Sequence, residues 1–309
     1  MHPAPRCRQY NVRVRSPSSG RRRPSHQPHF VSAPSELPPR AVLISHLAQR
    51  LPDWASVEWV DTTGSTNTDL LARARAGARL PALLGTTHQN QGRGRSNRNF
   101  HANPGDTLTF SCAFELDIAP IALPTLSVLA GLVACETLTQ SLGRDHALCL
   151  KWPNDLQWGE AKLAGLLLES AGIMTGRAAR VVVGLGVNLR GADRLTAALG
   201  RPVADWSHTG SRRAVADVCA DLANAWRVAF AQAADAWVEG VGLPDLPARY
   251  AQHDALRGRP VNVLENGEVQ LQGIADGVAP DGQLRIRTAG GIALVNVGDV
   301  SVRAQAGQP

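Results

Sequence analysis

Residues 89–98 read Gln-Asn-Gln-Gly-Arg-Gly-Arg-Ser-Asn-Arg, with apolar stretches on both sides, Ala82 to Thr87 and Leu108 to Phe114. Glycine has no side chain and tolerates positive φ, so such a loop can present backbone N–H groups to a ligand. Its guanidinium groups can bind phosphate or carboxylate through paired hydrogen bonds. A solvated basic loop is the alternative for this pattern alone. The flanking apolar segments place the loop inside a folded domain, where other polar motifs can meet it.

Positive charge is concentrated at the N-terminus of this chain. The 309 residues carry a formal net charge of +6, and residues 1–40 contain eight arginines against the single acid Glu36. Because the remainder is close to neutral, the net charge does not by itself indicate a nucleic-acid-binding protein.

The cysteines and the apolar segments predict the compartment. Five cysteines, an odd number, lie far apart in the sequence, and four have the apolar neighbours typical of buried free thiols. No apolar stretch approaches the roughly 18–20 residues of a membrane span, and the N-terminus lacks the apolar region of a secretory signal. We therefore expect a cytoplasmic protein that makes no membrane contact.

The chain divides into three parts by composition. Residues 1–40 are rich in Arg, Pro and Ser and are expected to be disordered. A translation start placed too far upstream, a basic tail with a polyanionic partner and a transit peptide all remain open for them. Residues 41–256 mix helical and strand periodicities, whereas 257–305 contain short strands and the hairpin signal Asn266-Gly267. This pattern predicts an α+β domain followed by a small β-barrel.

Three hydrogen-bonding side chains, Ser65, Thr66 and Asn67, precede a predicted helix over 68–76. Capping needs one hydroxyl, from Ser65 or Thr66, and Thr66 with Asp69 resembles a capping box. Three such side chains in succession also suit the binding of a small polar head group.

Two lysines occupy strands that otherwise look buried. Lys151 ends the segment 147–152 before the turn Pro153-Asn154-Asp155, and Lys162 begins the run 161–169. The turn residues alone have an ordinary structural explanation. A lysine in an apolar strand is costly unless it meets an anion, so both lysines indicate an anionic ligand.

A third predicted strand, 181–189, contains two glycines in its interior, where glycine weakens a strand. Gly184 and Gly186 interrupt a valine-rich run that ends at Asn188. Glycine in such a place indicates close approach of another group to the backbone.

Together these motifs resemble those of biotin protein ligases. The motifs are Ser65-Thr66-Asn67, Gln89 with Gly92-Arg93-Gly94-Arg95, Lys151-Trp152-Pro153-Asn154-Asp155, Lys162-Leu163-Ala164-Gly165 and Gly184-Leu185-Gly186-Val187-Asn188. They occur in the family's order over residues 42–303. The resemblance is to the monofunctional type, biotin–[acetyl-CoA-carboxylase] ligase, without an N-terminal DNA-binding domain. It implies a class II synthetase-like catalytic domain with a mixed, mostly antiparallel sheet, followed by an SH3-like barrel.

The resemblance also implies the reaction. Biotin and ATP would form biotinyl-5′-AMP, from which the acceptor lysine of a biotin carboxyl carrier protein takes the biotinyl group. Acetyl-CoA carboxylase or a related carboxylase would supply that partner, and the enzyme would be a monomer or homodimer without specific DNA binding. Mg²⁺ is expected to accompany the ATP phosphates, with Asp155 as the candidate carboxylate.

Site residues are carried over by matching motifs. The catalytic group implied is Lys162, Arg95, Lys151 and Asp155. The biotin-binding group is Ser65, Thr66, Asn67, Gln89, Arg93, Gly94, Arg95, Lys162, Gly165, Gly184 and Gly186. The nucleotide-binding group is Arg95, Arg98, Lys151, Asn154, Asn188 and Arg303. Trp206 is the aromatic side chain considered for stacking on adenine.

The sequence departs from the family at Ser96 and Asn97, where an Arg-Gly pair is common, and at Phe100, where Trp is common. Two alternatives accompany the main prediction. A lipoate–protein ligase shares the catalytic fold, although the Gly-Arg loop and the barrel argue against it. A non-catalytic nucleic-acid-binding protein would leave the lysine and Ser-Thr-Asn motifs unexplained.

Overall fold

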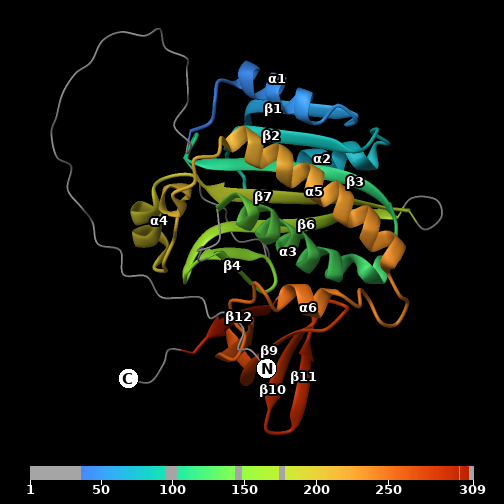
Figure 1. Cartoon of the computed structure of the whole chain (residues 1–309), viewed down its shortest axis with the longest axis vertical. Helices are drawn as coiled ribbons and strands as arrows, with labels where there is room; N and C mark the ends of the chain where they lie inside the picture. The colour runs from blue at the N-terminus through green and yellow to red at the C-terminus, as the bar shows by residue number, and fades with distance from the viewer. Residues whose placement is uncertain (1–35, 95–102, 143–147, 174–177, 299, 306–309) are drawn as a thin grey trace, which may run out of the picture.

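Seven strands form the larger of two sheets in the computed structural model, which describes residues 36–94, 103–142, 148–173, 178–298 and 300–305 (Figure 1). The strand order is β1-β2-β3-β7-β6-β5-β4. The strands are β1 (Ser56–Thr63), β2 (Ala82–Gln89), β3 (Thr107–Asp117), β4 (Leu148–Lys151), β5 (Asp155–Trp158), β6 (Ala161–Ile173) and β7 (Ala178–Asn188). Only β1 and β2 run parallel among the pairs of this sheet; the others are antiparallel. The predicted mixed, mostly antiparallel sheet is confirmed. Most of the tail predicted to be disordered, residues 1–35, lies outside the described residues.

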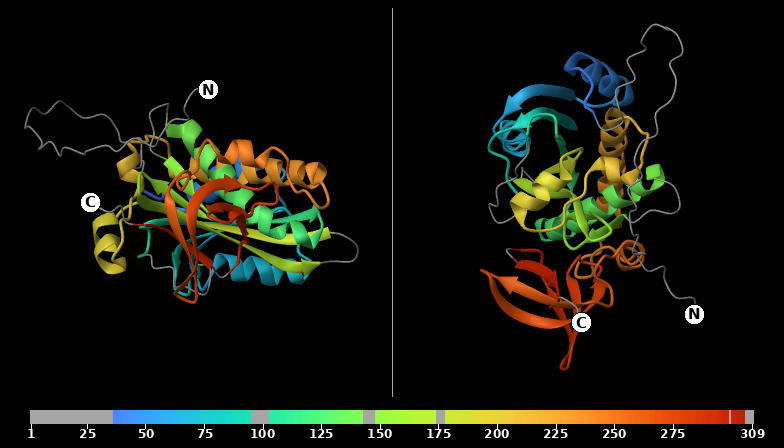
Figure 2. Two further views of the ribbon diagram at one scale, coloured as in Figure 1. Left: turned by 90° about the horizontal axis from the view of Figure 1, so that it is seen from below. Right: turned by 90° about the vertical axis from the view of Figure 1, so that its left-hand side faces the viewer.

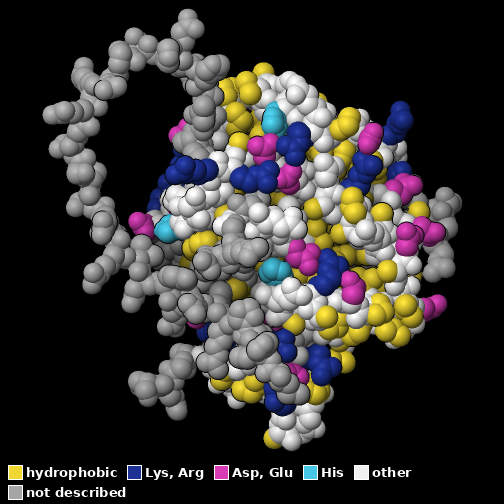
Figure 3. Space-filling model, viewed as in Figure 1, with side chains coloured by type: hydrophobic (Ala, Val, Ile, Leu, Met, Phe, Trp, Pro, Cys, Tyr) yellow, Lys and Arg dark blue, Asp and Glu magenta, His cyan; other side chains and the backbone are white. Residues whose placement is uncertain are grey.

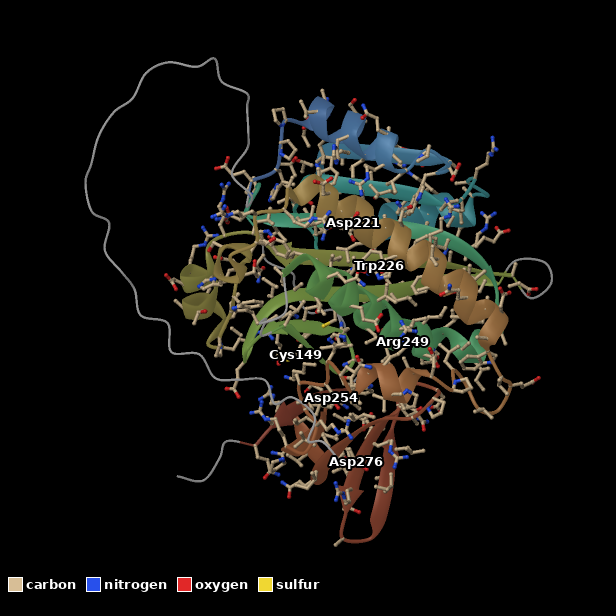
Figure 4. All side chains as sticks on the ribbon, viewed as in Figure 1. Cys149, Asp221, Trp226, Arg249, Asp254 and Asp276 are labelled. Atoms are coloured by element: carbon tan, nitrogen blue, oxygen red, sulfur yellow. The ribbon has the colours of Figure 1, made fainter. Side chains whose placement is uncertain are left out.

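Helices cover both faces of this sheet. Helices α1 (Arg40–Arg50), α3 (Leu123–Leu142) and α5 (Val215–Ala236) lie on one face, and α2 (Thr66–Arg75) lies on the other (Figures 1 and 2). Trp226 of α5 is fully buried, and its indole N–H donates to the carbonyl of Ala130 on α3 at 3.0 Å (Figure 4). The ring of Trp226 also lies 5.8 Å from that of Phe110 on β3. The first face therefore belongs to the larger apolar cluster, whereas a smaller one, with Leu70 and Leu71 of α2, lies on the second face.

Helix α3 corrects an expectation about apolar segments. The stretch Pro120–Gln140, which includes the short 3₁₀ helix Pro120–Ala122, is long and apolar enough to cross a membrane by length and composition. It packs on β4, β5 and β6 of the sheet beside α5, and 67% of this apolar stretch is buried inside the protein. The core of a folded domain accounts for that composition.

The helical face of the molecule carries paired charges. Arg50 of α1 contacts Asp217 and Asp221 of α5, each at 2.7 Å, and Arg249 contacts Glu136 at 2.8 Å. Figure 3 shows cationic and acidic side chains next to each other over this face. These charges largely neutralise one another, in contrast to the cavity described below.

Several local predictions differ from the structure. Ser65 is the N-cap of α2, and the Asp69 carboxylate accepts from the Thr63 hydroxyl at 2.5 Å, so the proposed Thr66–Asp69 capping box is wrong. Strand β5 pairs with β4 directly after the predicted turn. Helix α4 (Ala192–Leu199) and the short helix α6 (Leu246–Tyr250) occupy segments that lacked a clear periodic pattern.

A second sheet follows α6. It is antiparallel, with the order β11-β10-β9-β8-β12. The strands are β8 (Pro260–Glu265), β9 (Glu268–Val278), β10 (Leu284–Thr288), β11 (Gly291–Val295) and β12 (Val300–Ala304). The small β domain expected here is confirmed, while 41–256 and 257–305 remain the domain bounds that we propose. Trp152, next to Lys151, donates its indole N–H to the Gly282 carbonyl at 3.0 Å, so the two sheets share an apolar interface.

Asp254 lies at the junction between the two sheets (Figure 4). Its Oδ1 accepts from the Leu256 N–H at 2.8 Å, whereas its buried Oδ2 has no hydrogen-bond partner among the described residues. Burial raises the pKa of this carboxyl from 3.8 to about 6, against the opposing influence of the Leu256 N–H and of Arg257. The native protein therefore holds this proton more tightly than the unfolded chain does.

We expect Asp254→Asn to stabilise the protein increasingly as the pH rises from about 4 to 7. Between about pH 4 and 6 the unfolded chain releases this proton while the native protein keeps it, so the free energy of unfolding of the wild type falls; it levels off once the native carboxyl ionises as well. At pH 8 the variant should gain on the order of 1–3 kcal/mol. Thermal unfolding of both proteins across this pH range measures the difference, and a difference that does not change with pH would contradict the prediction.

Candidate active site

A cavity of about 890 Å³ opens on the second face of the large sheet. Its walls come from the N-terminus of α2, the ends of β2, β3, β6 and β7, the turn between β4 and β5, and strand β12. Fifteen of the seventeen site residues predicted from the sequence line it: Ser65, Thr66, Asn67, Gln89, Arg93, Gly94, Lys151, Asn154, Asp155, Lys162, Gly165, Gly184, Gly186, Asn188 and Arg303. The remaining two, Arg95 and Arg98, lie outside the described residues.

The polar end of the cavity is built at the start of α2. Ser65 is buried and extended, and its hydroxyl oxygen accepts from the Thr68 N–H at 3.4 Å. The Thr66 backbone N–H donates to the side-chain oxygen of Gln89 at 2.9 Å. Arg93 donates to the Thr68 hydroxyl at 2.7 Å and so draws the start of the Gly-Arg loop onto the same helix.

A chain of hydrogen bonds continues behind these residues. Thr66 Oγ1 lies 2.7 Å from Ser111 Oγ, and Ser111 Oγ donates to Asn67 Oδ1 at 2.6 Å. Because Ser111 has a single hydroxyl proton, the first of these bonds needs the proton of Thr66. That proton also faces the side-chain oxygen of Gln89, at the longer Oγ1–Oε1 distance of 3.3 Å. The Asn67 Nδ2 donates to the Leu167 carbonyl at 3.1 Å and to the Glu169 carboxylate at 2.9 Å.

Gly184 of β7 lies directly beneath this chain. A Cβ atom at this position would come within 2.2 Å of Asn67 Oδ1 and 3.1 Å of Ser111 Oγ. The first of these contacts is impossible without displacing the Asn67 side chain, and the second is tight enough to shift Ser111 slightly. The glycine in mid-strand is thus explained by close approach of the Asn67 side chain.

The lysine-bearing turn is held against β6. The Asn154 side chain donates to the Leu166 carbonyl at 2.5 Å, and the Leu166 N–H donates to the Asn154 carbonyl at 3.0 Å. Lys151 and Asp155 lie opposite each other in the β4–β5 pair, and Lys162 Nζ contacts Asp155 Oδ1 at 2.5 Å. Both lysines therefore reach the cavity from backbones that are fixed to one another.

The other end of the cavity is strongly cationic. Four cationic side chains lie here, Lys151, Lys162, Arg201 and Arg303, whereas Arg93 lies at the α2 end. Asp155 is the single carboxylate in the described lining. Burial lowers the pKa of Lys151, and Lys162, Arg201 and Arg303 add to this effect, against the opposing influence of Asp155. An anion bound among these groups would relieve their mutual repulsion.

Asn188 lies at the end of β7 within this cationic region. Its Nδ2 donates to the carbonyls of Ala204, at 3.1 Å, and Lys162, at 3.3 Å. These bonds tie the segment around Ala204 to the strand that carries Lys162. The side-chain oxygen of Asn188 is left to accept from a ligand.

Trp206 does not fit its predicted position at the nucleotide. Its side chain is only 2% exposed, and it does not belong to the described lining of the cavity. It begins a 3₁₀ helix (Trp206–Thr209) capped by Asp205. A ring buried in this way cannot stack on a bound base, so Trp206 is a core residue.

Sequence reasoning missed Thr109, Ser111 and Arg201. The first two share one face of β3, where Thr and Ser alternate with Leu and Phe, and both are buried. An alternating polar face on a strand of a large core was the signal available. Arg201 follows α4 in an irregular segment, where nothing in the pattern singled it out.

Two protein-family models match the chain. The biotin/lipoate A/B protein ligase family matches residues 61–188, and the C-terminal domain of biotin protein ligases matches residues 257–303. The biotin–[acetyl-CoA-carboxylase] ligase of Mycobacterium tuberculosis is 32% identical over 257 residues, covering 80% of this chain and 89% of the relative. The chain belongs to the biotin protein ligase family. It is a ligase, and the match over its C-terminal domain argues against the lipoate alternative.

This biotin protein ligase also resembles a bifunctional relative and a solved structure. The bifunctional ligase/repressor BirA of Escherichia coli is 30% identical over 252 residues, covering 82% of this chain and 75% of the relative. The fold also agrees with the solved structure of the biotin protein ligase from Aquifex aeolicus in complex with biotin and ATP. That structure has a TM-score of 0.62 and 22% identity, and it covers 81% of this chain and 99% of its own.

Proposed function

We propose that this ligase catalyses the ATP-dependent biotinylation of a lysine on a biotin carboxyl carrier protein, through biotinyl-5′-AMP. The observation that carries the proposal is one cavity with a hydrogen-bonding end at α2, where Arg93 also lies, and an end with four further cationic side chains. The family and the curated ligases support the overall reaction. The Aquifex aeolicus enzyme, whose structure is a complex with biotin and ATP, supports both as substrates.

The polar end suits the ureido ring of biotin, which has one carbonyl acceptor and two N–H donors. Ser65 uses its oxygen to cap α2 and keeps its hydroxyl proton, so it can donate to the carbonyl. Thr66 and Ser111 have committed their protons within the chain of hydrogen bonds and offer only acceptor oxygens. Donors and acceptors are therefore available in the proportion that a cyclic urea requires.

The cationic end suits the two anions that must react. In the first step the biotin carboxylate oxygen attacks the α-phosphorus of ATP, and pyrophosphate leaves. These anions repel each other in water, so cations fixed around them lower the barrier by positioning and charge neutralisation. Lys162 is proposed for the biotin carboxylate, and Lys151, Asn188 and Arg303 for the nucleotide. The Gly-Arg loop, including Arg95 and Arg98, is proposed to shield the adenylate from water.

The second step needs an amine rather than an anion. The neutral amine of the acceptor lysine attacks the carbonyl carbon of the mixed anhydride, and an amide bond forms. The C–O bond to AMP breaks with its electron pair on the phosphate oxygen, and the nitrogen releases one proton to solvent. Asp155 is the single carboxylate in the described lining of the cavity, and it already contacts an ammonium group, that of Lys162. We propose that it also helps to position the incoming lysine.

Magnesium is expected to arrive with ATP rather than in a site made by the protein. The described residues contain no group of three or more His, Cys, Asp or Glu side chains that could hold a metal ion. Asp155 is engaged by Lys162, and one carboxylate together with phosphate oxygens can suffice for Mg²⁺. The cytoplasmic location remains a prediction; the four described cysteines are free and buried.

Biotin-dependent exchange of pyrophosphate into ATP tests the proposal. We expect exchange with biotin and none with lipoate, and calorimetry should show biotin binding before ATP is added. Transfer is then measured with a biotin carboxyl carrier domain and with its acceptor lysine replaced by arginine. Exchange that proceeds equally well without biotin would refute the proposal.

A further inference from the structure

Glu169 lies on β6, and it does not belong to the described lining of the cavity. Its carboxylate accepts a hydrogen bond from the Asn67 Nδ2 at 2.9 Å, and it makes no ion pair with a described cationic side chain. A carboxylate that has no ionic partner but meets one buried amide needs an explanation. Hydrogen bonds to charged groups are among the stronger ones in proteins.

The orientation of the Asn67 amide follows from its neighbours. The Leu167 carbonyl and the Glu169 carboxylate can only accept hydrogen bonds, so the amide must turn its Nδ2 toward both. Its Oδ1 then faces Ser111 and lies over Gly184. Asn67 is 4% exposed, so an amide turned the other way would bury donors against Gly184 and Ser111.

This orientation sets the direction of the remaining hydrogen bonds. Because Asn67 presents an oxygen, Ser111 donates to it. The single hydroxyl proton of Thr66 is then engaged by Ser111 at 2.7 Å or by Gln89 at 3.3 Å, and with either acceptor it is not free for a ligand. The hydroxyl oxygens of Thr66 and Ser111, both in the cavity wall, then have only lone pairs to offer. A donor presented by Asn67 would permit the reverse direction, with hydroxyl protons facing the ligand.

We propose that Glu169 is a positioning residue that fixes the Asn67 amide, keeps Thr66 and Ser111 as acceptors, and so selects a ligand head group with N–H donors. This inference rests on the proposed function, because it assigns the selected groups to the ureido nitrogens of biotin. It makes Glu169 a determinant of specificity that acts on the ligand through Asn67.

Three variants test the role of Glu169. Glu169→Ala removes the acceptor, and biotin affinity should fall by about 10–100-fold, as expected for the loss of a hydrogen bond to a charged group. Glu169→Gln retains an acceptor oxygen and should stay within about threefold of the wild type. The matched control is Glu115→Ala on β3 of the same sheet, whose carboxylate contacts Arg180 at 2.6 Å outside the cavity wall; it should bind biotin normally.

The readouts separate positioning from stability. Calorimetry gives biotin affinity, and exchange kinetics should show a raised KM for biotin with kcat and the KM for ATP within about twofold of the wild type. A biotin analogue methylated on the ureido nitrogens should be rejected by the wild type. In Glu169→Ala the ratio of the affinity for biotin to that for this analogue should decrease, because the Thr66 and Ser111 hydroxyl groups are no longer held as acceptors.

Each outcome decides the matter. Wild-type affinity in Glu169→Ala, or equal losses of affinity in the Ala and Gln variants, would overturn the positioning role. A loss of kcat in proportion to thermal stability would assign Glu169 to folding instead. Failure of the wild-type protein to bind biotin would overturn this inference together with the proposed function. If the wild type binds biotin, the results with the variants test the role of Glu169 alone.

Discussion

Lys162→Ala is expected to slow biotinyl-adenylate formation by about 100–1,000-fold or more, the effect of deleting one preorganised charge at a reacting centre. The Lys162 ammonium lies in the cavity wall beside the single carboxylate there, that of Asp155. Its removal takes away a cation and also leaves Asp155 uncompensated where two further anions must bind. Both changes raise the energy of the state in which carboxylate and triphosphate meet.

Pyrophosphate exchange measures this loss, and a double variant divides it into its two causes. If the freed Asp155 repels the substrates, Lys162→Ala with Asp155→Ala should recover part of the rate lost in the single variant. Arg259→Ala is the control, because Arg259 pairs with Glu160 near the same hairpin but outside the cavity wall. Exchange at the wild-type rate in Lys162→Ala would remove this lysine from the mechanism.

Gly184→Ala is expected to reduce biotin affinity by about 100-fold or more, since such a methyl group must displace the polar end of the site. The added Cβ would lie 2.2 Å from Asn67 Oδ1, and Asn67 is held in place by Leu167, Glu169 and Ser111. Some loss of thermal stability should accompany it, on the order of 1–3 kcal/mol, because β7 is buried in mid-sheet.

Two other glycines calibrate that result. Gly165→Ala places its Cβ 2.9 Å from Lys162 Nζ, the end of a flexible side chain that can move, so it should cost less biotin affinity. Gly290→Ala has no atom closer than Thr288 Oγ1 at 3.9 Å and should behave as the wild type. Calorimetry with biotin on the three variants checks the order, and equal affinities would contradict the steric argument.

The sequence predicted the parts of this molecule that follow local rules. Periodic apolar residues located the core of α1, α3 and α5, and the mid-strand glycines and apolar-strand lysines indicated a site. Lys151 and Lys162 could be singled out because a charge in an apolar strand conflicts with burial. That conflict can be seen in the sequence without knowing which residues lie near each lysine in the fold.

What could not be predicted depends on contacts between distant segments. Glu169 lies 102 residues from the amide that it accepts from, and its register on β6 decides whether it reaches Asn67. Ser111 looked like an ordinary strand residue until α2 was placed against it. Trp206 was misjudged because an aromatic residue in an irregular segment gives no sign of whether its ring is buried.

The bond from Trp152 to Gly282 changes how a mutational screen of this enzyme should be interpreted. Trp152, which follows Lys151, donates its hydrogen bond to a loop more than a hundred residues later in the chain, and the two sheets share one apolar interior. A substitution in that loop can therefore shift Lys151 and, if Lys151 binds the nucleotide as proposed, weaken the use of ATP without any contact with a substrate. Loss of activity in such a variant would show that the loop holds the turn in place. It should not be counted as evidence that the loop binds substrate until the affinity for ATP has been measured.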